Sequence, residues 1–414
     1  MAIPKGWNLQ SLSQDVELRS GQHLLADEWH HEPIGVPYLT GPADFPNGHI
    51  VITKYTEHPK VMCSAGDVLI TVKGSGCGRL ARVSSAACIS RQLMAIRPCT
   101  WNSDFIFQVL TASSQLLADQ ASGLIPGLTR EQLLNLQFPI PPLPEQKKIA
   151  AVLSSVDAAI EKTEAVIAQL QVVKKAMMEQ LLTKGLPGRH TRFKQTDLGV
   201  IPEDWEVVSL GSVIDGIDAG WSPQCESRPA ANGEWGVLKI SSVTWGTFDP
   251  TENKKLPDHL VPRPNIAVHA GDVLLSRANT PELVGRTVIV EQTYSNLMLS
   301  DKLLRLRINR LVAEPRFINL VLGAPLWREL IQDAATGSSG SMKNLSQEKL
   351  RALPIPKPAT KEQDAIANII SAQDAVVRGE QLALDRLRTL KSALSSSLLS
   401  GELRVPTDSV PCPV

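Results

Sequence analysis

Several stretches have the composition of a catalytic motif, but none has the spacing that its chemistry requires. Residues 337–343 combine glycine, serine and lysine as a phosphate-binding loop does, without the spacing of that loop. Residues 74–78 are rich in glycine, yet the segment that follows, up to Val83, is too short for a dinucleotide-binding unit. Asp249 and Glu252 are similar to the metal-binding carboxylates of a nuclease, but they are too close in sequence to come from separate strands. The sequence therefore predicts no catalytic residue.

The cysteines and histidines predict no metal site. The six cysteines include no Cys-x-x-Cys pair, whereas zinc sites usually use such short spacings. We interpret them as reduced thiols of a cytosolic protein. His30 and His31 lie among acidic residues in an expected loop. No metal ion and no cofactor is expected in this chain.

The charge balance is neutral over the whole chain and uneven along it. The 414 residues include 42 Lys and Arg against 42 Asp and Glu, which argues at first against a nucleic-acid-binding protein. However, residues 67–97 contain five basic side chains against one acidic, and residues 271–310 contain six against four. Residues 1–198 carry 19 basic and 17 acidic side chains, and residues 199–414 carry 23 and 25. Zero net charge is therefore compatible with local basic faces.

Length and hydropathy limit the class of protein. A chain of 414 residues predicts two or three domains, because one core rarely grows beyond about 250–300 residues. No apolar run reaches the roughly 18 residues that span a bilayer, and the first residues lack the apolar core of a signal peptide. We expect no membrane association.

The two halves of the sequence repeat each other. Residues 128–182 align without a gap with residues 345–399, at a constant offset of 217. The matching pairs include Glu145-Gln146 with Glu362-Gln363, Asp157 with Asp374, Lys174 with Lys391, and Leu181-Leu182 with Leu398-Leu399. Further upstream, with small gaps, residues 65–70 match residues 270–275, Gly78-Arg79 matches Gly285-Arg286, and Trp7 matches Trp205. A period near 200 residues predicts two similar globular halves, each followed by the same tail.

Each tail is predicted to be one long helix. Apolar residues recur at alternating steps of three and four, which is a heptad seam, and Lys174 and Lys391 interrupt it at equivalent places. Helices of about 38 residues would be roughly 57 Å long. We expect the two helices to pair antiparallel and to hold the two globular halves at opposite ends. The residues assigned to helix pairing are Ile149, Val156, Ile160, Ile167, Leu170, Ile366, Val377, Leu384 and Leu387.

The globular halves are predicted to be of mixed α/β structure. Short strands are expected at residues 68–72, 273–275 and 287–290, and helices at 105–118 and 317–334. The proline-rich residues 139–144 and 354–358 are expected to be non-helical and to lead into the long helices.

This arrangement resembles the specificity (S) subunit of type I restriction–modification systems. The resemblance rests on the repeated tail, with its proline-rich start and Glu-Gln pair, and on the Gly-Asp-Val-Leu sequence at residues 66–69 and 271–274. A motif at residues 196–205, Thr-Asp-Leu-Gly-Val-Ile-Pro-Glu-Asp-Trp, has a shortened copy at residues 4–7. The resemblance covers essentially the whole chain, and the order of the motifs, given twice, is specific.

The resemblance implies an α+β fold with pseudo-twofold symmetry. Two target-recognition domains would each be followed by a long helix, and the helices would form an antiparallel coiled coil. The expected parts are 1–144, first recognition domain; 145–184, first helix; 185–204, connector; 205–359, second recognition domain; 360–401, second helix; and 402–414, a disordered tail.

The resemblance also implies a non-catalytic, cytoplasmic protein of a bacterium or archaeon. Each domain would read half of a split double-stranded DNA target, with the paired helices as a ruler between the half-sites. Partners would be two methyltransferase (M) subunits and, in the full complex, restriction (R) subunits. S-adenosylmethionine, ATP and Mg²⁺ would belong to those partners.

Candidate DNA contacts follow from chemistry, because basic side chains near glycine-rich loops suit phosphate contact, and Arg, Asn and Gln can read base edges. The candidates are Lys73, Ser75, Arg79, Arg91 and Gln92 in the first half, and Arg277, Asn279, Thr280, Arg286 and Lys302 in the second, with Tyr38, Thr40, Asn47, Lys239, Ser241 and Trp245 as secondary candidates. The alternative is that Arg79, Arg286, Arg91 and Lys302 have structural roles. A basic cluster between Lys184 and Lys194 is interpreted as a solvated linker in preference to a phosphate site.

Three other functions remain open from the sequence. The chain could be the specificity subunit of a complex that only methylates DNA. It could be a stand-alone nuclease that uses Asp249 or Glu252, or a coiled-coil scaffold that never touches DNA. The missing metal-binding carboxylates argue against the nuclease, and two similar basic-loop domains argue against the scaffold.

Overall fold

The computed structural model describes residues 3–74, 76–120, 127–339 and 342–406, and the chain divides into two compact units. The first unit consists of residues 1–166 and 380–414, and the second of residues 167–379. Each long helix contributes to both units. Each unit therefore contains one globular domain, the start of the helix that follows it and the end of the other helix.

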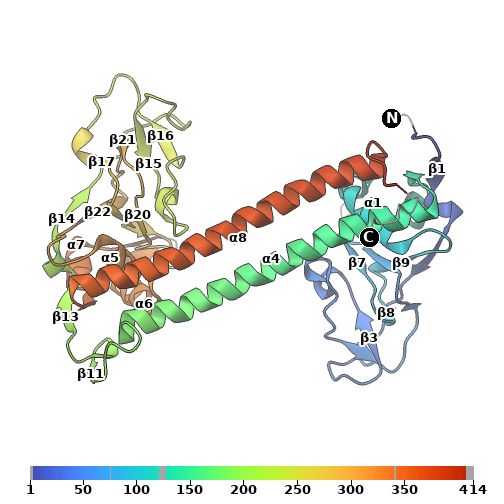
Figure 1. Ribbon diagram of the computed structural model, residues 1–414, viewed down its shortest axis with the longest axis horizontal. Coiled ribbons are helices and arrows are strands. Elements are labelled where there is room, and N and C mark those ends of the chain that lie inside the picture. The colour runs from blue at the N-terminus through green and yellow to red at the C-terminus, as the bar shows by residue number, and fades with distance from the viewer. Residues whose placement is uncertain (1–2, 75, 121–126, 340–341, 407–414) are drawn as a thin grey trace, which may run out of the picture. The chain divides into compact units, whose positions relative to one another are not determined.

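The first unit contains two four-stranded sheets and a strand pair (Figure 1). The antiparallel sheet has the order β2-β9-β6-β7, with β2 Val16–Ser20, β9 Leu93–Pro98, β6 Val68–Thr71 and β7 Leu80–Arg82. The other sheet has the order β4-β3-β8-β5, with β4 Tyr55–Thr56, β3 Val36–Leu39, β8 Ala87–Ile89 and β5 Met62–Cys63, and β3 is parallel to β8. Strand β1, Asn8–Ser11, pairs with β10, Gln137–Ile140.

The second unit repeats this plan. Its antiparallel sheet is β14-β22-β18-β20, with β14 Ile214–Ala219, β22 Leu303–Ile308, β18 Val273–Ser276 and β20 Thr287–Ile289. Its mixed sheet is β16-β15-β21-β17, with β16 Asn253–Lys255, β15 Gly236–Leu238, β21 Tyr294–Met298 and β17 Ala267–Val268. Strand β13, Glu206–Ser209, pairs with β25, Pro354–Lys357. Two further elements are a hairpin of β11, Phe193–Thr196, and β12, Gly199–Pro202, and a sheet of β19, Ala278–Asn279, β24, Met342–Asn344, and β23, Thr336–Ser339.

The central strands are apolar along their whole length because both faces of the sheet are covered. In β6, Val68 and Ile70 pack into a core with the helices of the unit, whereas Leu69 faces a separate core. In β18, Val273 and Leu275 pack with the helices and Leu274 faces the other side. The predicted strands at 68–72, 273–275 and 287–290 are confirmed within one residue.

The expected helices at 105–118 and 317–334 are each broken in two. The pairs are α1, Ser103–Ala112, with α2, Ser114–Gln120, and α5, Pro315–Gly323, with α6, Pro325–Ala334. Pro325 explains the second break, because proline cannot donate the backbone hydrogen bond that would continue α5. Shorter helices are α3, Arg130–Leu134, α7, Gln347–Ala352, and 3₁₀ turns at Leu12–Gln14, Pro42–Asp44, Pro46–Gly48, Leu210–Val213, Ile240–Val243 and Pro264–Ile266.

The long helices are α4, Leu143–Lys184, and α8, Thr360–Ser400 (Figure 1). The prediction that residues 139–144 are non-helical is wrong at its end, because α4 already includes Pro144. A proline is tolerated there, since the first backbone N–H groups of a helix have no acceptor within the helix. The other prolines of these runs lie in β10 and β25 or between the strand and the helix.

In each unit the start of one helix packs antiparallel against the end of the other. In the first unit Ile149 and Leu153 of α4 share a core with Leu398 of α8. In the second, Ile366 and Ile370 of α8 share a core with Leu181 and Leu182 of α4. The fold class is confirmed, with one refinement. At the helix starts the heptad seam is buried by the globular domain as well as by the partner helix.

A buried glutamate at the start of each long helix anchors that helix to its domain. Glu145 is 2% exposed and accepts hydrogen bonds from the Trp7 indole at 3.1 Å and from Arg404 at 2.7 and 2.9 Å. The repeat-related residue Glu362 is 1% exposed and accepts hydrogen bonds from the Trp205 indole at 3.3 Å and from His190 at 2.7 Å. Burial alone would raise the pKa of Glu145, but the bonds from Arg404 and Trp7 outweigh burial and lower the pKa.

Replacing Arg404 by methionine should reduce the free energy of unfolding at pH 7, because the buried carboxylate of Glu145 would lose its cation. The lowered pKa of Glu145 means that its stabilisation is present above the unfolded-state pKa and is lost as the pH falls through the folded-state pKa. Urea unfolding should therefore show a smaller difference between variant and wild type at pH 3 than at pH 7. Lys5→Met, at an exposed position, is the control, and an equal difference at both pH values would refute this role.

Two ion pairs at repeat-related positions join the helices. Lys391 contacts Asp157 at 2.5 Å in the first unit, and Lys174 contacts Asp374 in the second. The two lysines match each other at the offset of 217, and so do the two aspartates. The lysines that interrupt the apolar seam are therefore paired across it, and they fix the register of the helices, as polar seam residues can.

The two aspartates should differ in their contribution to stability. Asp157 also accepts a hydrogen bond from Gln108 at 2.7 Å and lies 3.7 Å from Arg82, so it joins the helices to the domain. We expect Asp157→Ala to reduce the free energy of unfolding by about 2 kcal/mol and Asp374→Ala by about 1 kcal/mol. Urea unfolding of the full chain measures both values, and equal losses would contradict the role of Asp157 as a junction.

Candidate nucleic-acid interface

Three basic residues of the first unit converge on one end of its antiparallel sheet. Strand β6 ends at Thr71, which pairs with Leu93 at the start of β9, and Ile70 pairs with Leu80 at the start of β7. Because neighbouring strands run in opposite directions, the loop that joins β6 to β7 and the loop before β9 meet at this end. The first of these loops contains Lys73 and Arg79, and the second contains Arg91. We call this end of the sheet, with its two loops, the loop end.

The second unit has an equivalent loop end. Ser276 pairs with Leu303, and Leu275 pairs with Thr287, so Arg277 and Arg286 lie at the two ends of the connection from β18 to β20, and Lys302 lies in the loop before β22. The backbone connections are also the same. The N–H of Val72 donates to Gln92 at 2.8 Å, and the N–H of Arg277 donates to Lys302 at 2.8 Å. The basic main candidates of each half thus come together at the loop end of their own unit.

The cations of both loop ends have no acidic partner. Among the residues that the structure describes, no carboxylate forms an ion pair with Lys73, Arg79, Arg91, Arg277, Arg286 or Lys302. Other arginines of the same segments are paired, as Arg82 is with Asp104 and Arg307 with Asp218. The uncompensated positive charge therefore gathers at the loop ends, where it can attract an anionic ligand.

The Gly-Asp-Val-Leu motif has a structural role. Arg97 donates two hydrogen bonds to Asp67, at 2.7 and 2.8 Å, and Asp67 is 2% exposed. In the second unit Arg305 contacts Asp272 at 3.2 Å and Asp218 at 2.7 Å. Arg97 and Arg305 contribute to the basic excess of the sequence but are neutralised in the fold, so they are not available for DNA.

Some secondary candidates are fixed within the protein. Tyr38 is 1% exposed and its hydroxyl accepts a hydrogen bond from the Leu24 N–H at 3.1 Å, so this candidate DNA contact is buried within the domain. The Thr40 hydroxyl donates to Asp44 at 2.7 Å and accepts from Lys54 at 2.8 Å. Local hydrogen bonding occupies these side chains, and the mixture of polar types in the sequence could not indicate this.

The remaining candidates differ in accessibility. Trp245 is 77% exposed, whereas Lys239 and Ser241 both contact Glu252, the former at 3.4 Å. Gln92 is exposed, Thr280 is half-buried, and Asn279 is half-buried with its side-chain oxygen accepting from the Thr280 N–H. Ser75 and the side chain of Asn47 lie outside the described part of the chain.

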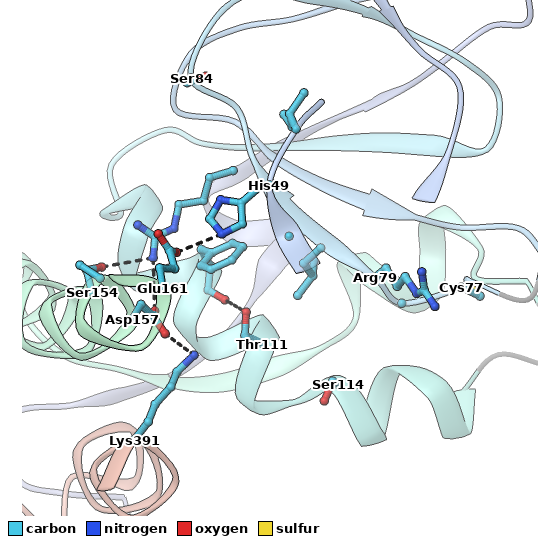
Figure 2. Close-up of a pocket in the computed structure, with 17 residues that line it drawn as sticks. His49, Cys77, Arg79, Ser84, Thr111, Ser114, Ser154, Asp157, Glu161 and Lys391 are labelled. Carbon is cyan, nitrogen blue, oxygen red and sulfur yellow. Dashed lines mark hydrogen bonds and ion pairs between the residues drawn. The ribbon is translucent and has the colours of Figure 1, made fainter. Parts of the chain in front are cut away.

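Each unit has a hollow that contains candidate residues. In the second unit a cavity of about 630 Å³ is lined by Lys239, Ser241 and Lys302. In the first unit a cavity of about 810 Å³ extends from Arg79 to the long helices, where Asp157 and Lys391 form their ion pair (Figure 2). Figure 2 shows Arg79 apart from this charged cluster.

Basic side chains of the connector form ion pairs with carboxylates of the same unit. Arg189 lies 3.4 Å from Glu362, and Arg192 pairs with Glu203 at 2.9 Å. His190 lies between Glu362 and Asp204, with its two ring nitrogens at 2.7 and 3.0 Å from the carboxylates. These contacts support a structural interpretation of a largely exposed segment, which leads into the hairpin of β11 and β12.

The described residues contain no group of three or more His, Cys, Asp or Glu side chains that could hold a metal ion. In the same part of the chain no helix is both long and apolar enough to cross a membrane. The two similar domains thus each present a basic loop end, which is a surface suited to an anionic ligand.

Comparison with known proteins identifies the family. The family described as "Type I restriction modification DNA specificity domain" matches residues 4–172 and 202–384. This chain therefore belongs to the type I restriction–modification specificity family and carries two copies of its domain.

The chain is similar to several specificity subunits. It is 37% identical over 171 residues to the EcoEI subunit of Escherichia coli, a match that covers 41% of this chain and 29% of that protein. It is 27% identical over 356 residues to the MjaVIII subunit of Methanocaldococcus jannaschii, covering 84% of this chain and 81% of that protein.

Solved structures share the fold. The S subunit from M. genitalium aligns with a TM-score of 0.62 at 14% identity, over 96% of this chain and 98% of that one. A chain from a study of complex assembly in the type I R-M system aligns with a TM-score of 0.57 at 17% identity, over 97% and 100%.

Substitutions of Arg91 and Arg97 should distinguish a role in DNA contact from a role in stability. Arg91→Gln should change stability by less than about 0.5 kcal/mol, because Arg91 is exposed and unpaired. It should reduce the slope of log affinity for DNA against log salt concentration by about one in the assembled complex. Arg97→Gln should instead cost about 3 kcal/mol of stability, because Asp67 stays buried without its cation. If both variants lower stability alike, Arg91 has a structural role.

Proposed function

We propose that the chain reads a bipartite double-stranded DNA target, with one loop end on each half-site. The observation that carries the proposal is a set of three cations at the loop end of each unit, which form no ion pair among the described residues and occupy the same two connections in both units. Exposed lysine and arginine side chains of this kind bind phosphates and position a protein on DNA. The halves would read different sequences because their loop residues differ.

Base reading would come from further polar and aromatic side chains of each domain. Gln92 is exposed in the first unit and can pair with an adenine edge. In the second unit the 77% exposed Trp245 offers an aromatic face for stacking, and the cavity lined by Lys239 and Lys302 offers donors. These side chains differ between the two domains, as expected for residues that set the specificity of each half-site.

The long helices offer a surface for partner subunits, which we take to be two methyltransferase subunits. Apolar residues recur every seven positions outside the seam, at Val152, Val166 and Val173 on α4 and at Ile369, Val376 and Leu390 on α8. They are 37–50% exposed, and the repeat relates Val152 to Ile369 and Val173 to Leu390. A repeated exposed apolar stripe favours two equivalent docking partners. Restriction subunits would join in the full complex, while a methylation-only complex is the alternative.

Catalysis and cofactors would belong to the partners. We assign S-adenosylmethionine, ATP and Mg²⁺ to the methyltransferase and restriction subunits, and place the complex with its DNA in the cytoplasm of a bacterium or archaeon. The alternative of a stand-alone nuclease finds no support at Asp249, whose carboxylate accepts hydrogen bonds from the Thr251 N–H and hydroxyl. Glu252 is held by Lys239 and Ser241.

Exchanging residues 13–138 for the same region of another family member tests the function. With its methyltransferase, the hybrid should protect DNA in which only one half-site has changed, and wild type should protect the original bipartite sequence. The matched control exchanges the corresponding region of the second domain and should change the other half. A change in both halves, or in neither, would contradict the assignment of one domain to each half-site.

A further inference from the structure

A buried arginine supports the loop end of the second unit. Arg328 of α6 is 8% exposed, and its Nη2 donates to the carbonyl oxygens of Val284 at 2.7 Å and Glu282 at 3.2 Å. Both carbonyls belong to the loop that leads into Arg286, one of the three unpaired cations. Arg328 therefore holds this loop from inside the domain.

Arg328 and Arg286 leave hydrogen-bonding capacity unused. Nη1 of Arg328 and Nε of Arg286 are buried and have no hydrogen-bond partner in the described part of the chain. No described carboxylate pairs with either guanidinium group. Burial, together with the nearby charge of Arg286, lowers the pKa of Arg328 to about 10, so it remains charged at neutral pH. Two adjacent cations without an anion are unfavourable, and a bound anion would relieve this.

At the equivalent turn of the first unit, the described residues place no cation within 4 Å of a Cβ added to the glycine. Gly78 and Gly285 are equivalent and have positive φ angles of 86° and 71°, so the same turn precedes Arg79 and Arg286. A Cβ at Gly78 would lie nearest to Leu117, whereas a Cβ at Gly285 would meet Ile331 and, at 3.3 Å, Nη1 of Arg328. An apolar side chain thus backs the turn in both domains, Leu117 in the first and Ile331 in the second, and the second domain adds a cation beside it. The fold does not require this arginine.

We propose that Arg286 and Arg328 form a phosphate site for the DNA backbone in the second recognition domain. The proposal rests on the proposed function. Arg286, which is partly exposed, contacts the phosphate. Arg328 is a positioning residue, which fixes the loop through two carbonyl groups and adds a second positive charge. The first domain holds its DNA at this place through Arg79 alone.

The test measures DNA affinity of the assembled complex against salt concentration. Arg286→Gln should reduce the slope by about one, the effect of one lost phosphate contact. Arg328→Leu, which copies the apolar backing of the first domain, should reduce it by part of that amount. The control is Arg310→Gln, because Arg310 is exposed, follows the opposite end of β22 and should leave the slope unchanged. An unchanged slope in Arg286→Gln would overturn the proposal. If Arg328→Leu does not fold, Arg328→Lys replaces it and should retain the slope but weaken binding.

A second experiment identifies the source of the anion. Neutral methylphosphonate linkages are placed one at a time in the second half-site. A neutral linkage at one position should weaken DNA binding by the wild-type complex several-fold, and the same linkage should not change DNA binding by the Arg286→Gln complex. If no position behaves this way, or if inorganic sulfate stabilises the free chain through Arg286 while every linkage is neutral in effect, the site does not bind DNA phosphate. Absence of sequence-specific binding by the wild-type complex would refute the proposed function itself, and is thus a separate result.

Discussion

The buried carboxylates of Glu145 and Glu362 determine how each unit is assembled. A buried charged group requires hydrogen-bond or ion-pair partners, and the partners of each glutamate come from segments that are distant in the sequence. Glu145 accepts hydrogen bonds from the Trp7 indole, at the start of the domain, and from the guanidinium group of Arg404, after α8. Glu362 accepts a hydrogen bond from the Trp205 indole and forms an ion pair with Arg189, after α4. One interaction thus fixes a domain, the helix that leaves it and the end of the other helix.

The glutamine beside each glutamate extends this junction. Gln146 accepts a hydrogen bond from the Asn102 N–H, where α1 begins, and donates to the carbonyl of Pro141. Gln363 makes the corresponding bonds with Glu314 and Pro358. The Glu-Gln pair is therefore a connection between the sheet-covering helices, the proline-rich turn and the long helix. Its occurrence in both halves reflects this shared structural demand.

The distribution of ion pairs explains how a neutral chain can present basic surfaces. Acidic residues of the Gly-Asp-Val-Leu motif neutralise arginines inside the sheets, as Asp67 does for Arg97. Cations at the loop ends have no such partner in the described residues. The same fold then allows the domains to differ beside this turn, with Leu117 alone in one and Ile331 together with Arg328 in the other. Divergence at these places leaves the common framework unchanged.

The sequence by itself determined the duplication, the long helices, the central strands and the set of loops that carry basic residues. These features depend on periodicity and on repeated motifs, which are local or directly comparable along the chain. It also located Lys174 and Lys391 as polar interruptions of the seam. The assignment of their partners, Asp374 and Asp157, required the antiparallel register of the helices.

Only the tertiary structure decided which polar side chains are free. Tyr38 is of a type that can contact DNA bases, but its side chain is buried. Arg97 is basic, but it forms an ion pair with Asp67. Arg328 gave no sequence signal, because it lies in a helix more than 40 residues after the loop that it supports. Burial and ion pairing depend on contacts between segments that are distant in the sequence. Residue type and spacing could therefore indicate the loops, but could not distinguish side chains that are free to contact DNA from side chains that stabilise the domain.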